Sequence, residues 1–195
     1  TLIDTMKVFA AVASDLISAN YKIPKEDALK LYLETSGLPF FQQLNVMFPG
    51  NNLNKKVADI YEETKGDNLK SSDLVMKSDE KEALQILARR GYCLSVSSGG
   101  IQKIVNQFVS ECDVPFAHAL GYRDGFDKGR AHFDYILEEE GGVAADIVLV
   151  GDSLRDMQKA REYGADFIAK IGTFQKGDFG DAPAVEHLRE LLHIV

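Results

Sequence analysis

Two aspartates, Asp152 and Asp156, have the spacing in this 195-residue chain that most directly predicts chemistry. They lie in the segment I-V-L-V-G-D-S-L-R-D, residues 147–156, where four apolar and mostly β-branched residues run into Gly-Asp. Such a run is typical of a buried parallel strand, and Ser153 predicts the cap of a following helix. Two carboxylates at the carboxyl end of a central strand suit a hard cation such as Mg²⁺. The structural alternative is a turn residue followed by a helix-dipole partner.

Two further polar groups follow strands that are predicted earlier in the chain. Ser98 stands in the run S-S-G-G, residues 97–100, directly before a predicted helix. A hydroxyl and free backbone N–H groups at a helix start favour an anion, and Gly99 lets the backbone approach it. Lys128 stands before the next helix, where it can neutralise a phosphate or pair with the carboxylates. Each residue alone has a simple structural explanation, so the hypothesis depends on the ordered set.

The elements that must position these residues change type near Gly91. Apolar spacing predicts helices before it, and residues 10–75 read as helical throughout. Alternating strands and helices follow it. Strands are expected over residues 92–97, 116–120, 147–150 and 167–171, and helices over residues 101–112, 129–140 and 185–194. Four strands with intervening helices imply a Rossmann-like α/β fold, in which one parallel sheet carries helices on both faces.

Composition limits the classes of partner. The chain is 45% hydrophobic and 27% charged, with a net charge of −8 and a pI of about 5.0. An acidic balance argues against nonspecific binding to nucleic acid or to an anionic membrane. No apolar run approaches the roughly 20 residues of a membrane span, and no signal peptide is recognised. The sequence does not indicate an oligomeric state.

Cysteine and histidine usage predicts neither disulfides nor a transition-metal site. Cys93 and Cys112 are the only cysteines, and both lie in apolar-patterned segments, which favours a reduced cytoplasmic protein. The four histidines show no metal-ligand spacing with cysteine or with one another, so we expect structural roles for them. These histidines are His118, His132, His187 and His193.

The ordered set resembles the motifs of the haloacid dehalogenase-like (HAD) superfamily, most of whose members are Mg²⁺-dependent phosphatases. Ser98, in S-V-S-S-G-G-I, matches the second motif, and Lys128 matches the third. The hexapeptide G-D-S-L-R-D, residues 151–156, matches the fourth motif, G-D-S-x-x-D. The opening T-L-I-D-T is similar to the tail of the first motif, D-x-D-G-T-L-x-D-S/T.

The resemblance also implies a domain organisation. Residues 1–9 and 76–195 would form a HAD-like α/β core, and residues 10–75 a small all-helical cap. This arrangement is similar to that of phosphoglycolate phosphatase-like and β-phosphoglucomutase-like members. The family's nucleophile and general acid/base, the two aspartates of D-x-D, would lie just before Thr1 on the central strand. We expect that strand upstream of Thr1, because its absence would expose two strand edges across a gap. Asp4 is expected at the hinge to the cap.

The implied reaction is Mg²⁺-dependent hydrolysis of a small soluble phosphomonoester through an aspartyl-phosphate. Ser98 and the Gly99 N–H would bind phosphoryl oxygens, and Lys128 would bind the phosphate and the nucleophile together. Asp152 and Asp156 would serve the metal. Phosphomutase and dehalogenase chemistry occur in the same superfamily.

Two other classes of function are compatible with parts of the sequence. A non-catalytic HAD-like protein that binds a phosphorylated ligand or partner is expected if the first motif is truly absent. A serine esterase is the second alternative, because residues 151–154 spell G-D-S-L, with Ser153 as nucleophile. Esterases of that kind carry this motif near the N-terminus, whereas here it comes late, and the nearest tail match for their D-x-x-H is Glu190 to His193.

Overall fold

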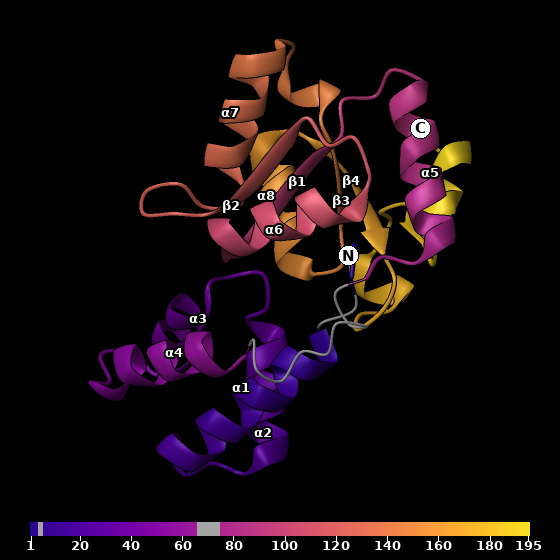
Figure 1. Ribbon diagram of the computed structural model, residues 1–195. Helices are drawn as coiled ribbons and strands as arrows, with labels where there is room; N and C mark the ends of the chain where they lie inside the picture. The colour runs from indigo at the N-terminus through magenta and orange to yellow at the C-terminus, as the bar shows by residue number, and fades with distance from the viewer. Residues whose placement is uncertain (4–5, 66–74) are drawn as a thin grey trace. The chain divides into compact units, whose positions relative to one another are not determined.

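The helical periodicity of the first third of the chain produces a helical unit, Ile3–Val75 (Figure 1). In this computed structural model the described residues are 1–3, 6–65 and 75–195, so Asp4 and part of the predicted helical stretch lie outside them. The helices of the unit are α1 (Met6–Tyr21), α2 (Lys25–Glu34), α3 (Phe40–Met47) and α4 (Leu53–Thr64).

Apolar residues at helical spacing form the core of this unit. Ala13 and Ile17 of α1 are completely buried, and Leu44 of α3 and Val57 of α4 belong to the same cluster. Asn54 is one of the buried polar residues of this unit, and its amide donates to the carbonyl of Phe48 at 2.8 Å while its oxygen accepts from the Tyr21 hydroxyl at 2.7 Å. The buried amide therefore ties the start of α4 to the ends of α1 and α3 without an unmet hydrogen bond.

The α/β unit comprises Thr1–Leu2 and Met76–Val195. Its helices are α5 (Ser78–Arg89), α6 (Gln102–Cys112), α7 (Arg130–Glu140), η2 (Ala144–Asp146), α8 (Leu154–Tyr163), η3 (Lys176–Phe179) and η4 (Leu188–His193). Its strands are β1 (Ser95–Ile101), β2 (His118–Tyr122), β3 (Val148–Gly151), β4 (Asp166–Lys170) and β5 (Ala184–Val185). Strand–helix alternation from β1 onward confirms the predicted α/β fold class.

The strands are parallel but form two sheets in the part of the chain that the structure describes. One has the order β1-β2 and the other the order β3-β4-β5 (Figure 1). The prediction of one sheet is therefore wrong for the described residues, because β1 and β3 are not hydrogen-bonded to each other. β1 and β3 therefore each have one edge that pairs with no other described strand.

Two predicted element boundaries are also wrong. The first strand begins at Ser95 rather than at Tyr92, because its ladder with β2 starts at the pair Ser95 and His118. The closing α-helix over residues 185–194 is replaced by the short strand β5 and the 3₁₀ helix η4. Its apolar residues still reach the core, since Leu188 and Leu191 are buried.

No helix among the described residues is both long enough and apolar enough to cross a membrane.

Candidate active site

The Gly-Asp-Ser segment connects β3 to α8 as the sequence predicts. Gly151 ends β3 and Leu154 begins α8. Ser153 is the N-cap, because its extended backbone lets the side-chain oxygen accept the Asp156 N–H at 3.1 Å. The Ser153 side chain is also buried, with 2% exposure. A buried hydroxyl that caps a helix is poorly placed as a nucleophile, which argues against the esterase alternative.

The close approach of β3 and α8 depends on Gly151. A Cβ atom on Gly151 would lie 2.7 Å from Asp156 Cβ and 2.8 Å from Asp156 Oδ2, closer than real Cβ contacts allow. The absence of a side chain at this position therefore lets the first turn of α8 place the Asp156 carboxylate beside the end of β3.

Gly151→Ala is expected to lower the free energy of unfolding by about 1–3 kcal/mol, because the added methyl must displace Asp156. Urea denaturation measures the change. Gly172→Ala is the control, since nothing lies within 4 Å of a Cβ at that position. Equal stability of the two variants would show that α8 shifts freely.

Lys128 and Asp156 form an ion pair in the interior of the site. Lys128 Nζ lies 2.8 Å from Asp156 Oδ1, and the two side chains are only 13% and 2% exposed. Lys128 is the cationic group that the structure places directly beside this carboxylate oxygen. Such a buried carboxylate is stable only with a cation beside it. The fold therefore brings together two residues that lie 28 positions apart in the sequence.

Asp152 is held in its charged form at the same edge. Its Oδ1 atom accepts a hydrogen bond from the Thr1 hydroxyl at 2.8 Å. Burial alone would raise the pKa of Asp152, but the hydrogen bond from the Thr1 hydroxyl and the charge of Lys128 both lower it. These two groups therefore favour the charged form of the carboxylate.

The chemistry of this edge fits a divalent cation. Carboxylate oxygens are the ligands that Mg²⁺ prefers, and Asp152 and Asp156 supply them. The Lys128 ammonium lies 2.8 Å from Asp156 Oδ1, and its charge also lowers the pKa of Asp152. Two carboxylates that attract the same cationic group also favour a metal ion.

The Ser-Ser-Gly-Gly segment differs from the prediction in its local structure. Residues 98–100 belong to the end of β1, where the register with β2 shifts, and α6 begins only at Gln102. Ser98 is therefore not the N-cap of that helix, and its hydroxyl oxygen accepts the Gly100 N–H at 3.0 Å. Gly99 has open space around its Cα, because no atom lies within 4 Å of a Cβ built there. Ser98 and Gly99 thus lie where the register of the β1–β2 ladder shifts, and room remains for a ligand beside Gly99.

Two basic groups near the ion pair were not singled out by the sequence. Burial, together with the charge of Lys128, lowers the pKa of Lys159 to about 8, although Asp156 opposes the shift. His132 is completely buried, and its Nδ1 atom lies 2.8 Å from the Ser97 hydroxyl. Lys159 stands three residues after Asp156, on the same face of α8, and that spacing was the available signal.

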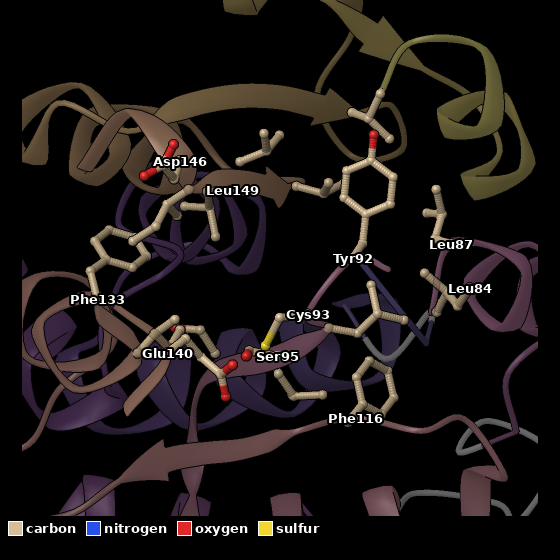
Figure 2. Close-up of a pocket in the computed structure, with 18 of the residues that line it drawn as sticks. Leu84, Leu87, Tyr92, Cys93, Ser95, Phe116, Phe133, Glu140, Asp146 and Leu149 are labelled. Atoms are coloured by element: carbon tan, nitrogen blue, oxygen red, sulfur yellow. The ribbon is translucent and has the colours of Figure 1, made fainter. Parts of the chain in front are cut away.

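A largely apolar cavity of about 420 Å³ extends from this edge between β1 and β3. Residues of both strands line it, including Ser95 and Leu149, and Figure 2 shows these side chains around the space with Phe133. Thr1 and Lys128 line the cavity as well, so it is continuous with the candidate site. Among the described residues, β1 pairs only with β2, and β3 only with β4, so each strand has an unpaired edge.

The sequence was compared with models of known protein families. The sequence model for haloacid dehalogenase-like hydrolases matches residues 1–170. The chain belongs to the haloacid dehalogenase-like hydrolase family. This membership confirms the resemblance, the α/β fold class and the prediction of an enzyme.

Solved structures agree with the assignment of this HAD-like fold. A hydrolase from Pseudomonas syringae superposes with a TM-score of 0.78 at 16% identity and covers 99% of this chain and 92% of its own. For a provisionally assigned phosphoglycolate phosphatase from Lactobacillus delbrueckii subsp. bulgaricus the TM-score is 0.75 at 17% identity, with 100% and 93% covered. CbbY from Rhodobacter sphaeroides, in complex with xylulose-(1,5)bisphosphate, gives 0.73 at 15% identity, with 98% and 92% covered. A search of curated proteins found no match to the HAD-like chain.

Proposed function

We propose that this HAD-like hydrolase is a Mg²⁺-dependent phosphatase that hydrolyses a small soluble phosphomonoester through an aspartyl-phosphate. The observation that carries the proposal is the buried ion pair of Lys128 and Asp156, which lies at the sheet edge where Asp152 follows β3. An ion pair between a lysine and a carboxylate, set beside a second carboxylate, provides both signs of charge that a phosphoryl group and its metal require.

The residues of the chain would divide the work as follows. Lys128 neutralises negative charge on the phosphate and on the nucleophile, while the Ser98 hydroxyl and the Gly99 N–H donate to phosphoryl oxygens. Asp152 and Asp156 hold the metal, Asp156 directly or by orienting its ligands. Mg²⁺, when bound, supplies charge stabilisation for the transferring group. The nucleophile and the general acid/base would come from a D-x-D strand that precedes Thr1.

The cavity between β1 and β3 supports the assignment of the nucleophile to such a strand. Residues of β1 and β3 line it, and among the described residues each of these strands has an unpaired edge that an extended segment could satisfy. Thr1 lines one end of the cavity and contacts Asp152, so a segment that leads into Thr1 would deliver its last residues beside the two carboxylates.

The helical residues 10–75 would act as a cap that excludes water and selects the leaving group, with residues 1–9 and 76–195 as the core. Close relatives in fold include a protein that holds xylulose-(1,5)bisphosphate, which supports a small phosphorylated substrate rather than a nucleic acid or a membrane. We place the protein in the cytoplasm, because both cysteines are free.

Hydrolysis of p-nitrophenyl phosphate by the full-length protein, with and without Mg²⁺, tests the proposal. We expect turnover that EDTA abolishes and Mg²⁺ restores, and we expect Asp152→Asn to reduce it at least a hundredfold because a carboxylate needed at the metal is lost. Unchanged turnover in Asp152→Asn would refute the metal assignment. Phosphate-ester binding without turnover in the wild type would instead support the non-catalytic alternative.

A further inference from the structure

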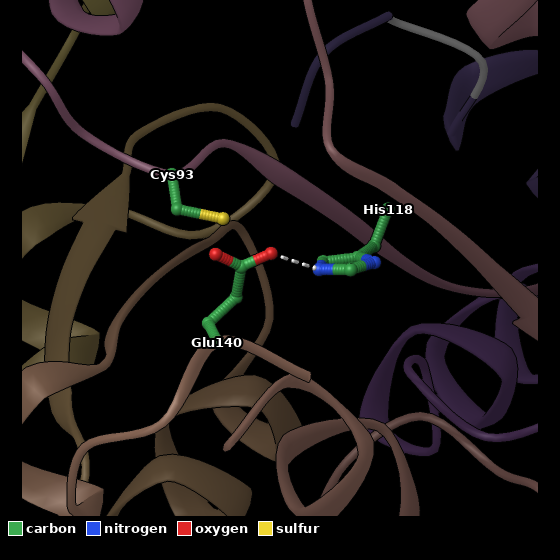
Figure 3. Close-up of side chains that lie close together, drawn as sticks. All are labelled: Cys93, His118 and Glu140. Carbon is green, nitrogen blue, oxygen red and sulfur yellow. Dashed lines mark hydrogen bonds and ion pairs between the residues drawn. The ribbon is translucent and has the colours of Figure 1, made fainter. Parts of the chain in front are cut away.

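A second cluster of potential ligands lies at the opposite end of β1 from Ser98. Cys93, His118 and Glu140 each offer one ligand atom, and these atoms all lie within 4.8 Å of one another. His118 Nε2 is 2.8 Å from Glu140 Oε1, and the Glu140 carboxylate lies between the thiol and the imidazole in Figure 3. At about 3.3 Å per strand residue, Cys93 is roughly 16 Å along the chain from Ser98. Cys93 and Glu140 line the same cavity as Lys128, but the cluster lies at the end of β1 that is remote from Ser98.

The pairing of β1 with β2 helps to explain why these three residues meet. Ser95 and Ser97 point toward one face of β1, where Ser97 contacts His132 of α7, and Cys93 lies in the segment directly before this strand. His118 pairs directly with Ser95 across the ladder and therefore faces the same way. These side chains consequently point toward the side of the sheet that α7 covers.

Helix α7 completes the cluster at its carboxyl end. Glu140 is the last residue of α7, and Tyr135 of the same helix packs edge-on against the His118 ring at 5.5 Å. The His118 side chain is thereby fixed, with 11% exposure, whereas Glu140 is 43% exposed and Cys93 is exposed. One ligand is therefore held by the packing of its ring, whereas the other two side chains are less tightly packed.

We propose that Cys93, His118 and Glu140 bind one borderline-soft divalent transition-metal ion of the zinc class. A thiolate, an imidazole and a carboxylate form a donor set that selects such ions over Mg²⁺. Tetrahedral coordination with bonds of about 2.0–2.3 Å places ligand atoms about 3.5 Å apart, so the accessible side chains need only small movements. Three protein ligands leave a fourth position for water. The bound ion joins the segment before β1, the start of β2 and the end of α7.

Titration of the full-length protein with Co²⁺, after dialysis against a chelator, tests this site by absorption. Cobalt bound to a thiolate in tetrahedral geometry gives intense visible bands and a near-ultraviolet charge-transfer band. We expect these bands to saturate at one equivalent and to disappear when Zn²⁺ is added, while an excess of Mg²⁺ leaves them unchanged. This readout does not depend on phosphatase activity.

Matched variants assign the ligands. Cys93→Ser is expected to abolish the charge-transfer band, and His118→Asn and Glu140→Gln to weaken Co²⁺ binding at least tenfold. The controls are Glu139→Gln, an exposed neighbour on the same helix, and Cys112→Ala, the buried cysteine, and both should bind Co²⁺ like the wild type. Circular dichroism verifies that each variant is folded. Absence of the bands in the wild type, or their persistence in folded Cys93→Ser, would overturn the proposal.

Discussion

Lys128→Met is expected to lower the free energy of unfolding by about 3 kcal/mol and to reduce kcat/KM by more than a hundredfold. The stability loss follows from the burial of Asp156, which is 2% exposed and has the Lys128 ammonium 2.8 Å from its Oδ1 atom. Removal of the lysine leaves a buried carboxylate without its cation, which costs more than the pair itself contributes. The activity loss follows from the proposed role of Lys128 at the phosphate.

A double variant separates these two consequences of the Lys128 substitution. Lys128→Met with Asp156→Asn removes the buried charge along with its partner, so most of the stability should return, while kcat/KM should remain low. Chemical denaturation and steady-state kinetics measure the two effects independently. Lys176→Met provides the control, because Lys176 is exposed. A change of less than about 0.5 kcal/mol and less than tenfold in kcat/KM would mean that Lys128 is merely a solvated lysine.

The part of the site that the sequence predicted well is the part built by local structure. The run of residues 147–150 into Gly151, with Ser153 as cap, contains its own strand, turn and helix start, and the structure confirms the cap. Position along the chain also placed Lys128 and Asp152 after successive strands, because parallel strands with helical crossovers align their carboxyl ends. The ordered motifs thus identified the family from short segments that are individually weak.

The Ser98 segment shows where local sequence patterns were insufficient to predict the structure. Ser-Ser-Gly-Gly has the composition of a helix start, yet the ladder with β2 extends through it and α6 begins at Gln102. Gln102 explains the shift, because its side chain bonds the Ala119 carbonyl at 2.6 Å and the Gly121 N–H at 2.9 Å. These long-range hydrogen bonds fix the helix start, and no local pattern predicts them.

The Cys93, His118 and Glu140 cluster was missed for a different reason. Metal-ligand motifs are recognised by spacing within short segments, but these ligands are separated by 25 and 22 residues. They meet because two paired strands and one crossover helix bring them to one face. The available sequence signal was the position of His118 at the start of β2 and of Glu140 at the end of α7. This signal can be interpreted only with the register of β1 and β2, which the structure provides.

The burial of His132 is expected to make the free energy of unfolding depend strongly on pH. Burial lowers the pKa of His132 to about 4, and the charges of Lys128 and Lys159 act in the same direction, while backbone hydrogen bonds oppose them. The unfolded chain has the ordinary histidine pKa of about 6.5. Between these two values the unfolded state binds more protons than the folded state. The free energy of unfolding therefore falls as the pH falls from about 6.5 to about 4, by about 3 kcal/mol in total.

Equilibrium unfolding in urea at pH 7, 6, 5 and 4.5 measures this dependence. The wild type should lose stability steadily through the series, whereas His132→Asn, which cannot gain a proton, should be less stable at pH 7 but nearly independent of pH down to about 5. His193→Asn, at an exposed position, should keep the wild-type slope.

Carboxylates add their own slope below about pH 5, so the comparison depends on the difference between His132→Asn and the wild type. Parallel curves for these two proteins would contradict a neutral, buried His132. Because His132 contacts Ser97 on β1, its protonation would also disturb the strand that leads to Ser98, so phosphatase activity should fall in the same pH range.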